Sequence, residues 1–346
     1  MTYLRPCGLV WGATARDAAH GGVGGLIGGG ATGFTACEVI ERDGGGVRRK
    51  WLGFGALKAT PELAERLALI EAPRPEVAGL DFARPCIMGV INVTPDSFSD
   101  GGRTPEPESA IAHGRALAAE GADVLDVGGE STRPYAEPLP LEDERARALP
   151  VVEALASDGR FVSIDTRKAV IMREAVAAGA GMVNDVSALT HDPESAAAVR
   201  DLDVPVVLMH SRGDPKTMQV DPRYDDVTLD VFDALAARIA ACEAAGIDRR
   251  RIIVDPGIGF GKTAEHNLAL LGGLTLLHGL GVPLLVGASR KAFIGRLTGE
   301  QVAGRRAAGS LGAAVAIVMQ GVQIVRVHDV AETRQALAVW QAAMGT

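Results

Sequence analysis

The sequence predicts an α/β protein, a (β/α)8 TIM barrel with a small glycine-rich N-terminal extension. From residue 86 onward, short apolar runs alternate with Ala- and Leu-rich stretches of helical periodicity. Eight such strand-then-helix units occur, and a barrel of this kind uses roughly 250 residues, which fits a chain of 346. The alternative is an open doubly wound sheet, which more often has six strands and a glycine fingerprint after the first.

Eight apolar runs bounded by turn-forming residues are predicted to be the barrel strands. They are residues 86–92, 123–128, 161–166, 181–186, 204–210, 251–257, 282–288 and 322–328. The helical stretches between and after them include residues 109–120, 142–156, 168–178, 227–245, 305–320 and 330–344. Strands that alternate with helices in this way are typical of a parallel sheet.

Residues 1–80 differ from the remainder and are expected to form an N-terminal extension to the barrel at residues 84–346. The extension is predicted to be either partly flexible or a small α+β subdomain. Its glycine-rich run at 20–33 approaches a Gly-x-Gly-x-x-Gly pattern, but Ile27 takes the third glycine position. No strand or helix is evident beside that run, so nucleotide binding is not expected there. We expect a hairpin of residues 34–42 and 47–56, a helix at 61–70 and a linker at 73–75.

Composition excludes several classes of protein. The net charge is -8 and the pI is about 5.5, whereas general nucleic-acid binding needs a basic surface. The four cysteines form no Cys-x-x-Cys pair, which indicates reduced thiols and a cytoplasmic protein. No apolar run approaches the ~18 residues of a membrane span, so no membrane association is expected.

Each predicted strand carries a polar or reactive group at or near its carboxyl end, where the active sites of α/β barrels lie. A single Asp at such a place often only caps the next helix, and Asp185 is assigned that role. Groups at all eight ends are hard to explain as caps. The groups are Asn92, Asp126 with residues 129–134, Asp165, Asn184, His210, Asp255, residues 289–291, and Arg326 with His328.

These residues form two groups that suit different ligands. The first comprises donors and acceptors near mid-barrel, which suit a flat heterocycle with a guanidine-like edge. Its members are Asp165, Asn184, Asp255 and Lys291. The second group is an anion site, with a magnesium ion and Asn92 completing the charge balance. Its members are Ser131, Thr132, Arg133, Arg326 and His328.

The loop after the first barrel strand makes the prediction more specific. Residues 88–103, sixteen in a row, resemble the signature of dihydropteroate synthases. Further blocks of that family follow in the same order, and the resemblance covers residues 84–344. These blocks are residues 128–134, 165–166, 184–185, 209–210, 255–262, 289–291 and 326–330.

The resemblance implies an enzyme of folate biosynthesis that joins a dihydropterin-methyl diphosphate to 4-aminobenzoate, giving dihydropteroate and diphosphate. It implies that Asp165, Asn184, Asp255 and Lys291 bind the pterin and that Asn92 binds Mg²⁺. The diphosphate would be held by Ser131, Arg133, Arg326 and His328.

The same resemblance implies an aminobenzoate pocket, where sulfonamides compete, and a homodimer. That pocket would be lined by Phe98, Thr132, Pro134 and Ser289. Asp96 and Asp100 would lie on a loop that closes over the site. The residues expected to take part in catalysis are Asp96, Phe98, Asp100, Arg133 and Lys291.

The chain departs from the family pattern at two places. Tyr135 stands where the family commonly has glycine, which would stiffen the loop or narrow the aminobenzoate entrance. After His210 the chain reads Ser211-Arg212-Gly213-Asp214-Pro215 where Met-Gln-Gly-x-Pro is usual, so the pterin rim is expected to differ in shape.

Two alternative functions remain on the sequence alone. One is a pterin-dependent methyl transferase that passes a methyl group to a corrinoid, which needs no diphosphate site. The other is an inactive pterin-binding paralogue that carries or sequesters its ligand. The complete loops at residues 92–103 and 131–134, with Arg326 and His328, favour the synthase over both. A purely structural protein has only the N-terminal extension in its favour.

Overall fold

The computed structural model describes residues 1–44, 46–93, 107–131, 136–213 and 216–346. Its larger part is a barrel of eight parallel strands, each of which lies inside the range predicted for it. The strands are β5 (Cys86–Asn92), β6 (Val124–Gly128), β7 (Val162–Asp165), β8 (Met182–Asp185), β9 (Val206–Met209), β10 (Ile252–Asp255), β11 (Leu285–Val286) and β12 (Ile324–Val327).

The sheet closes on itself, which excludes the open doubly wound alternative. The strands are hydrogen-bonded in the order β10-β9-β8-β7-β6-β5-β12-β11. The two ends of this order meet through a parallel bridge between Val254 and Leu284. There the amide of Val254 donates to the carbonyl of Pro283 at 3.0 Å. The expected TIM barrel is therefore confirmed.

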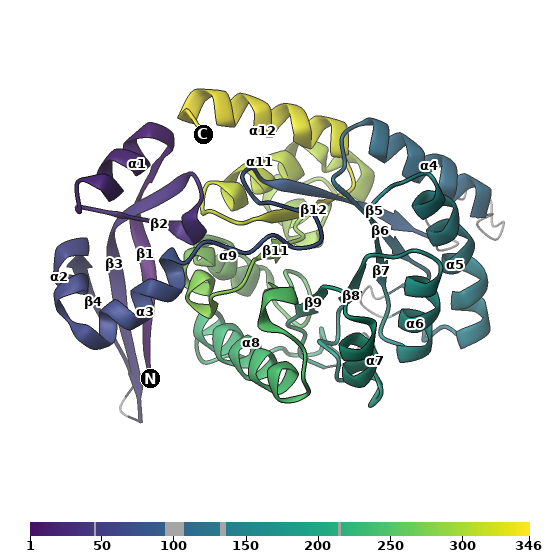
Figure 1. Ribbon diagram of the computed structural model, residues 1–346, viewed down its shortest axis with the longest axis horizontal. Coiled ribbons are helices and arrows are strands. Elements are labelled where there is room, and N and C mark those ends of the chain that lie inside the picture. The colour runs from purple at the N-terminus through teal and green to yellow at the C-terminus, as the bar shows by residue number, and fades with distance from the viewer. Residues whose placement is uncertain (45, 94–106, 132–135, 214–215) are drawn as a thin grey trace.

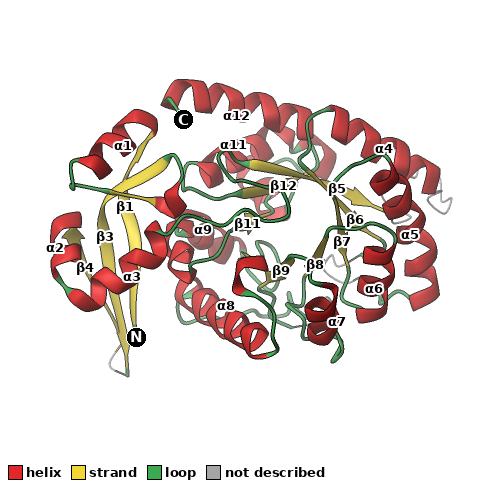
Figure 2. Cartoon of the chain, in the orientation of Figure 1, coloured by secondary structure: helices red, strands yellow, loops and turns green. Residues whose placement is uncertain are grey.

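Helices surround the strands, as Figures 1 and 2 show. They are α4 (Pro107–Ala119), α5 (Leu141–Ser157), α6 (Ala169–Ala177), α7 (Ser195–Leu202), α8 (Val227–Ala244), α9 (Ala264–Gly272), α10 (Ala292–Thr298), α11 (Ala307–Val318) and α12 (Val330–Met344). Short 3-10 turns η3 (Arg249–Arg251), η4 (Leu274–Leu280) and η5 (Ala303–Arg305) lie between some of them. None of the helices in the described part of the chain is long and apolar enough to cross a membrane.

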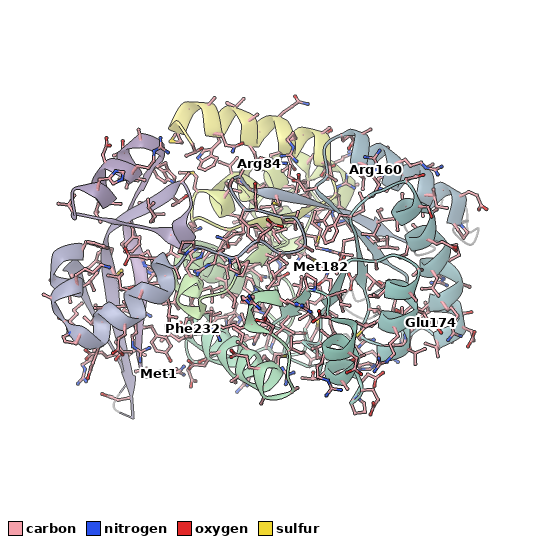
Figure 3. All side chains as sticks on the ribbon, in the orientation of Figure 1. Met1, Arg84, Arg160, Glu174, Met182 and Phe232 are labelled. Atoms are coloured by element: carbon pink, nitrogen blue, oxygen red, sulfur yellow. The ribbon has the colours of Figure 1, made fainter. Side chains whose placement is uncertain are left out.

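Every second side chain of a barrel strand points inward. Successive inward positions form an apolar layer and, above it, a polar layer. The lower layer is apolar and forms one buried cluster, with Met182 near its centre (Figure 3). Its strand residues include Met88, Val124, Met182, Val207, Ile253, Leu285 and Ile324. Two residues further along four of these strands, the inward positions are polar. They are occupied by Asp126, Asn184, Asp255 and Arg326.

The first 71 residues form a second, antiparallel sheet with three helices. Its strands are β1 (Thr2–Trp11), β2 (Gly25–Leu26), β3 (Thr32–Asp43) and β4 (Gly46–Gly53). Its helices are α1 (Gly12–His20), α2 (Phe54–Ala59) and α3 (Pro61–Glu71), with a 3-10 turn η1 (Ile27–Gly29). The central strand β3 pairs with all three others, and we call the whole unit the N-terminal sheet.

The N-terminal sheet corrects two expectations from the sequence. The predicted hairpin corresponds to β3 and β4, but residues 54–56 begin α2 instead of extending the strand. The glycine-rich run was expected to lack a flanking strand and helix, yet β1 and α1 precede it directly. Within that run, Gly25 and Leu26 pair antiparallel with β3, so they belong to a sheet and not to a phosphate-binding loop.

The N-terminal sheet packs against the barrel through apolar and polar contacts. Tyr3 meets Phe232 of α8 edge to face, with ring centroids 5.3 Å apart, and Figure 3 shows Phe232 on the side of α8 toward the sheet. The indole of Trp11 donates to the carbonyl of Met319 at 2.9 Å. The hydroxyl of Thr275 in η4 donates to the carbonyl of Pro6 at 3.0 Å.

Two further contacts fix the ends of this unit. Gly12, at the start of α1, has a φ of +58°, and a Cβ added there would lie 2.3 Å from the carbonyl oxygen of Gly345. Position 12 therefore requires glycine, because the backbone after α12 approaches it closely. Figure 1 shows the C-terminus beside α1. The expected linker at residues 73–75 has no helix or strand, but Arg74 within it is buried and donates to the carbonyl of His278 at 2.9 Å.

Candidate active site

The polar layer of the barrel holds a hydrogen-bonded network centred on Asp126, which is fully buried. Arg326 reaches from β12 and donates through Nε to Asp126 Oδ2 at 2.7 Å and through Nη2 to Asp165 Oδ2 at 2.9 Å. The amide of Asn184 donates to Asp126 Oδ2 at 3.0 Å. The guanidinium of β12 therefore joins carboxylates of β6 and β7, and Asp126 extends the network to β8.

The carboxylates of this network keep acceptor atoms available inside the barrel. Asp126 Oδ1 and Asp165 Oδ1 are buried and have no hydrogen-bond partner among the described residues. Burial raises the pKa of Asp165 to about 8; the facing Arg326 opposes this, whereas Asp126 adds to it. Buried acceptors are normally satisfied, so this pair suits a ligand that brings N–H donors in one plane.

Asp255 lies at the end of β10, and the turn after it has a strict backbone requirement. The amide of Gly257 donates to Asp255 Oδ1 at 2.7 Å. Gly257 has a φ of +66°, and a Cβ there would lie 1.9 Å from the carbonyl oxygen of His210. Burial raises the pKa of Asp255, and the neighbouring Lys291 opposes that shift.

Two lysines stand on this side of the barrel. Lys291 donates to the carbonyl of Ile258, and its Nζ lies 4.9 Å from the ring centroid of Phe260. Burial lowers the pKa of Lys291 to about 8. Lys262 Nζ lies 2.9 Å from His210 Nδ1, and burial lowers the pKa of Lys262 to about 7. Burial and the nearby Lys262 lower the pKa of His210 to about 3, so the imidazole that faces the Lys262 amine is neutral.

The loops after β11 and β12 lie side by side. Ser289 Oγ is 3.0 Å from His328 Nδ1 and accepts from the backbone amide of His328 at 3.2 Å. Arg290 pairs with Asp329, which joins the same two loops a second time. Arg290 has a φ of +58°, a strained value for a side-chain-bearing residue, and Arg306 and Ser310 hold its carbonyl and amide in place.

The loop after β9 interlocks with the loop after β10. Gln219 donates to the carbonyl of Gly259 at 2.6 Å, and the hydroxyl of Tyr224 donates to the carbonyl of Gly261 at 2.8 Å. The guanidinium carbon of Arg212 lies 5.2 Å from the ring centroid of Tyr224. Arg212, one of the residues that depart from the family pattern, therefore packs beside the turn that leads from Asp255.

The structure brings the first group of predicted residues together around Asp126 and Asp255. Arg326, which was predicted for the anion site, is paired with Asp165 of the first group and with Asp126, and Ser289 lies beside His328. Asn92 at the end of β5 and Ser131 after β6 are both half-buried. The predicted residues Asp96, Phe98, Asp100, Thr132, Arg133 and Pro134, together with Tyr135, lie outside the described residues.

Asn92 fits the kind of ligand that Mg²⁺ takes in enzymes. In the described part of the chain, no three His, Cys, Asp or Glu side chains are grouped as a metal ion would need. Mg²⁺ is often held by one or two protein oxygens together with substrate phosphates and water, and the amide of Asn92 offers one such oxygen.

No role was predicted from the sequence for three residues at this end of the barrel, Asp126, Lys262 and His210. Asp126 was noted in its strand but not placed in the site, although its inward position two residues after Val124 was a usable signal. Lys262 and His210 form a pair that no spacing in the sequence indicates. Asp185 was expected to cap the next helix, but it accepts from the amide and hydroxyl of Ser187 and the amide of Leu189 and so stabilises the turn that follows β8.

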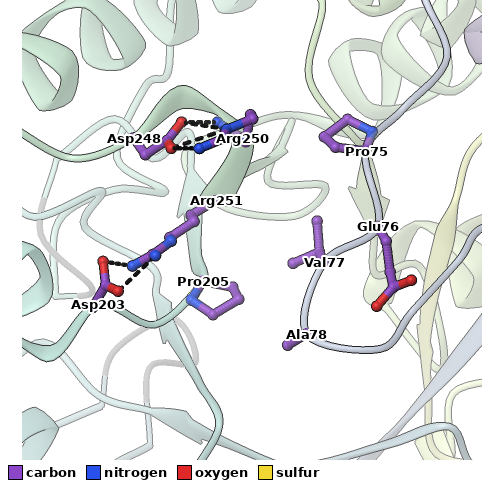
Figure 4. Close-up of a pocket in the computed structure, with 9 residues that line it drawn as sticks. All are labelled: Pro75, Glu76, Val77, Ala78, Asp203, Pro205, Asp248, Arg250 and Arg251. Carbon is purple, nitrogen blue, oxygen red and sulfur yellow. Dashed lines mark hydrogen bonds and ion pairs between the residues drawn. The ribbon is translucent and has the colours of Figure 1, made fainter.

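A hollow of about 370 Å³ opens at the opposite end of the barrel (Figure 4). It lies between residues 75–78 and the turns that precede β9 and β10. Its arginines are already paired, Arg250 with Asp248 and Arg251 with Asp203. Catalytic groups of TIM barrels lie at the carboxyl ends of the strands, so this hollow is not the candidate site.

Comparisons with known proteins agree on one family. A family model described as "pterin binding enzyme" matches residues 88–328, more than half of the chain. The dihydropteroate synthase of Neisseria meningitidis serogroup B is 50% identical over 269 residues, which cover 76% of this chain and 94% of that protein.

Solved structures give the same result. The chain is 52% identical, with a TM-score of 0.74, to a Xanthomonas albilineans dihydropteroate synthase determined with 4-aminobenzoic acid. It is 43% identical, with a TM-score of 0.75, to the Yersinia pestis dihydropteroate synthase in a complex with a sulfonamide drug. Each alignment covers 79% of this chain and 99% of the other.

Proposed function

The chain belongs to the dihydropteroate synthase family of pterin-binding enzymes, and from this premise we propose how its barrel performs the family's transferase reaction. The enzyme condenses (7,8-dihydropterin-6-yl)methyl diphosphate with 4-aminobenzoate and releases 7,8-dihydropteroate and diphosphate. The observation that carries the assignment of the site is the network of Asp126, Asp165, Asn184 and Arg326, whose free acceptors lie buried inside the barrel.

The pterin ring is proposed to lie across the polar layer. Its amino and ring N–H groups would donate to Asp165 and Asp255, while Asn184 and Lys291 would donate to its carbonyl and ring nitrogens. A planar donor edge facing a carboxylate forms two parallel hydrogen bonds, which fix the orientation of the ring. Binding also shields the site from water, so these hydrogen bonds strengthen.

The diphosphate is proposed to lie over the loops after β6 and β12. Ser131, Arg133, Arg326 and His328 would hold its oxygens, with Asn92 as a ligand of Mg²⁺. When bound, Mg²⁺ would neutralise charge on the leaving diphosphate. Of these groups, His328 is oriented by Ser289, since the hydroxyl contacts both its ring and its backbone amide.

The reaction exchanges one bond of the pterin methylene carbon for another. The C–O bond to diphosphate breaks, and its electron pair goes to the leaving oxygen. The aminobenzoate nitrogen supplies the electron pair for the new C–N bond. This nitrogen then loses a proton. Phe98, Thr132, Pro134 and Ser289 are proposed to line the aminobenzoate pocket. Asp96 and Asp100 would stabilise positive charge on the pterin-methyl group. An arylamine is already nucleophilic, so positioning contributes most.

We also propose that the enzyme is a cytoplasmic homodimer that sulfonamides inhibit. All four cysteines are free thiols, which agrees with a reducing compartment. Light scattering after size-exclusion chromatography would measure the mass of the assembly, and a monomer at micromolar concentration would overturn the dimer.

Diphosphate release by the purified protein tests the function. The assay contains the dihydropterin diphosphate, Mg²⁺ and 4-aminobenzoate, with and without a sulfonamide. Release that requires aminobenzoate and is blocked by the drug is expected. Pterin binding without turnover would instead support the inactive paralogue.

A further inference from the structure

We infer that Arg42 and Arg49 of the N-terminal sheet are positioning residues for the pterin pocket. Both reach from the sheet to the start of α8, and through it they hold the loop that packs on the Asp255 turn. This inference rests on the proposed function of the barrel. The family model begins at residue 88, so both arginines lie outside the part of the chain that it matches.

Arg49 holds the first residue of the α8 cap. Its Nη2 donates to Asp226 Oδ2 at 2.6 Å, while Asp226 Oδ1 accepts from the amides of Thr228 and Leu229 at 3.1 and 3.2 Å. One carboxylate thus satisfies the free N–H groups of the helix and binds the N-terminal sheet. The position of Asp226, where the β9–α8 loop joins the helix, therefore depends on its contact with Arg49.

Arg42 makes the second attachment. Its Nη1 donates to Asp230 Oδ1 at 2.6 Å, and its Nη2 lies 3.6 Å from Asp225. The other oxygen of Asp230 accepts from the amide of Asp225 at 3.1 Å. Asp225 and Asp226 are consecutive residues at the end of the loop. Arg49 binds Asp226 directly, and Arg42 holds the backbone of Asp225 through Asp230.

The loop transmits this attachment to the pocket over a short distance. Tyr224, the residue before Asp225, donates to the carbonyl of Gly261. Gln219 of the same loop donates to the carbonyl of Gly259, and a Cβ on Gly259 would lie 3.3 Å from Lys291 Cδ. The turn held by this loop is therefore the one that carries Asp255 and packs on Lys291.

The sheet that carries the two arginines is itself fixed to the barrel. The hydroxyl of Tyr3 donates to Asp233 of α8 at 2.8 Å, beside the Tyr3–Phe232 ring contact. The Arg42 and Arg49 side chains are only 26% and 39% exposed, and Asp226 is 23% exposed. Partly buried pairs are screened less by salt than surface pairs, so these contacts restrain the loop.

A matched pair of double variants tests the inference in the full-length enzyme. Arg42→Gln with Arg49→Gln removes both attachments. Arg48→Gln with Lys50→Gln removes the same charge from the same hairpin, but these side chains pair with Glu41 and Asp43 inside the N-terminal sheet. For each we would measure kcat, the KM for the pterin diphosphate and the melting temperature.

We expect the KM for the pterin diphosphate to rise about fivefold in the first variant relative to the second, with kcat within about twofold. Arg49→Lys alone, which keeps the charge, is expected to restore most of the affinity that Arg49→Gln loses. Equal KM values in the two double variants would overturn the inference. A lower kcat and melting temperature with unchanged KM would also overturn it, because the arginines would then only stabilise the fold.

A result that refutes the proposed function can be distinguished from one that refutes the role of the arginines. An unmodified enzyme that releases no diphosphate refutes the function. Titration calorimetry with the pterin diphosphate then still compares the two double variants, and equal dissociation constants would refute the positioning role independently.

Discussion

Asp126 illustrates at the scale of single residues how the barrel combines charge and burial. It accepts from Arg326 and Asn184 within a fully buried position, so its partners on β8 and β12 depend on one oxygen atom. Arg326 in turn shares its guanidinium between Asp126 and Asp165. A change at Asp126 therefore reaches both the pterin side and the diphosphate side of the proposed site.

Asp126→Asn tests this dependence. We expect the free energy of unfolding to fall by about 1.5–3 kcal/mol, because hydrogen bonds to charged groups are lost, and the KM for the pterin diphosphate to rise about tenfold. Asp123→Asn is the control, since Asp123 pairs with Arg84 and Arg334 at the other end of the strand. Urea denaturation measures the free energy of unfolding and steady-state kinetics measure the KM of both variants. An unchanged KM in Asp126→Asn would contradict the prediction.

The pH dependence of pterin binding follows from Lys291. Burial lowers its pKa to about 8, and a lysine is charged below its pKa, so the ammonium is lost as the pH rises through 8. We expect kcat/KM for the pterin diphosphate to decline above that pH. In Lys291→Arg the decline moves to higher pH, because a guanidinium stays protonated. Lys50→Arg, at an exposed position, is the control, and an identical profile in all three proteins would refute the assignment.

At the scale of elements, the sequence predicted the barrel strands well and the N-terminal sheet less well, for a physical reason. Each barrel strand is an apolar run that ends at a turn, a local signal. β1 contains Pro6 and Gly8, which argue against a strand, and it forms only because it pairs with β3 more than twenty residues away. Pro6 is tolerated there because β1 pairs on one side alone.

The candidate site shows the same limit. Asp165, Asn184 and Asp255 were predictable because each lies at the end of a strand or one residue before it. The pairs Arg326–Asp126 and Lys262–His210 were not, because each joins residues from different strands or from the loops that follow them. Periodicity identifies elements, whereas such pairs depend on how the closed sheet places them.

The turn after β10 gives a test at this scale. Gly257→Ala would place a Cβ against the His210 carbonyl at a φ of +66°, so we expect a loss of about 2–4 kcal/mol in the free energy of unfolding. Gly272→Ala, at the end of α9 with open space around it, is expected to be neutral or to gain about 0.5–1 kcal/mol. Urea denaturation of both variants checks this, and equal stabilities would contradict it.

At the scale of the whole molecule, the N-terminal sheet and the barrel share an extensive contact. Tyr3, Pro6 and Trp11 of β1 bond to α8, η4 and the end of α11 respectively. The sheet has its own small apolar core, but these contacts join it to helices from the second half of the barrel.

We therefore expect the two parts to unfold together. Trp11 lies at the contact and Trp51 on the exposed strand β4, whereas the third tryptophan, Trp340, is buried in α12. In a Trp340→Phe variant, tryptophan fluorescence therefore reports on the N-terminal sheet. Far-UV circular dichroism reports mostly on the helices of the barrel. The two signals are expected to give one coincident urea transition, and separate midpoints would show that the sheet unfolds independently.

The contact between Gly12 and Gly345 also bears on how the chain is made. The N-terminal sheet emerges from the ribosome before the barrel, yet α8, η4 and α11 emerge only after most of the barrel strands, and Gly345 follows the last barrel helix. The face of the sheet that covers the barrel must therefore stay uncovered during translation. The N-terminal sheet is made before the barrel but must wait for it, and that interval is when a nascent chain most needs protection from aggregation.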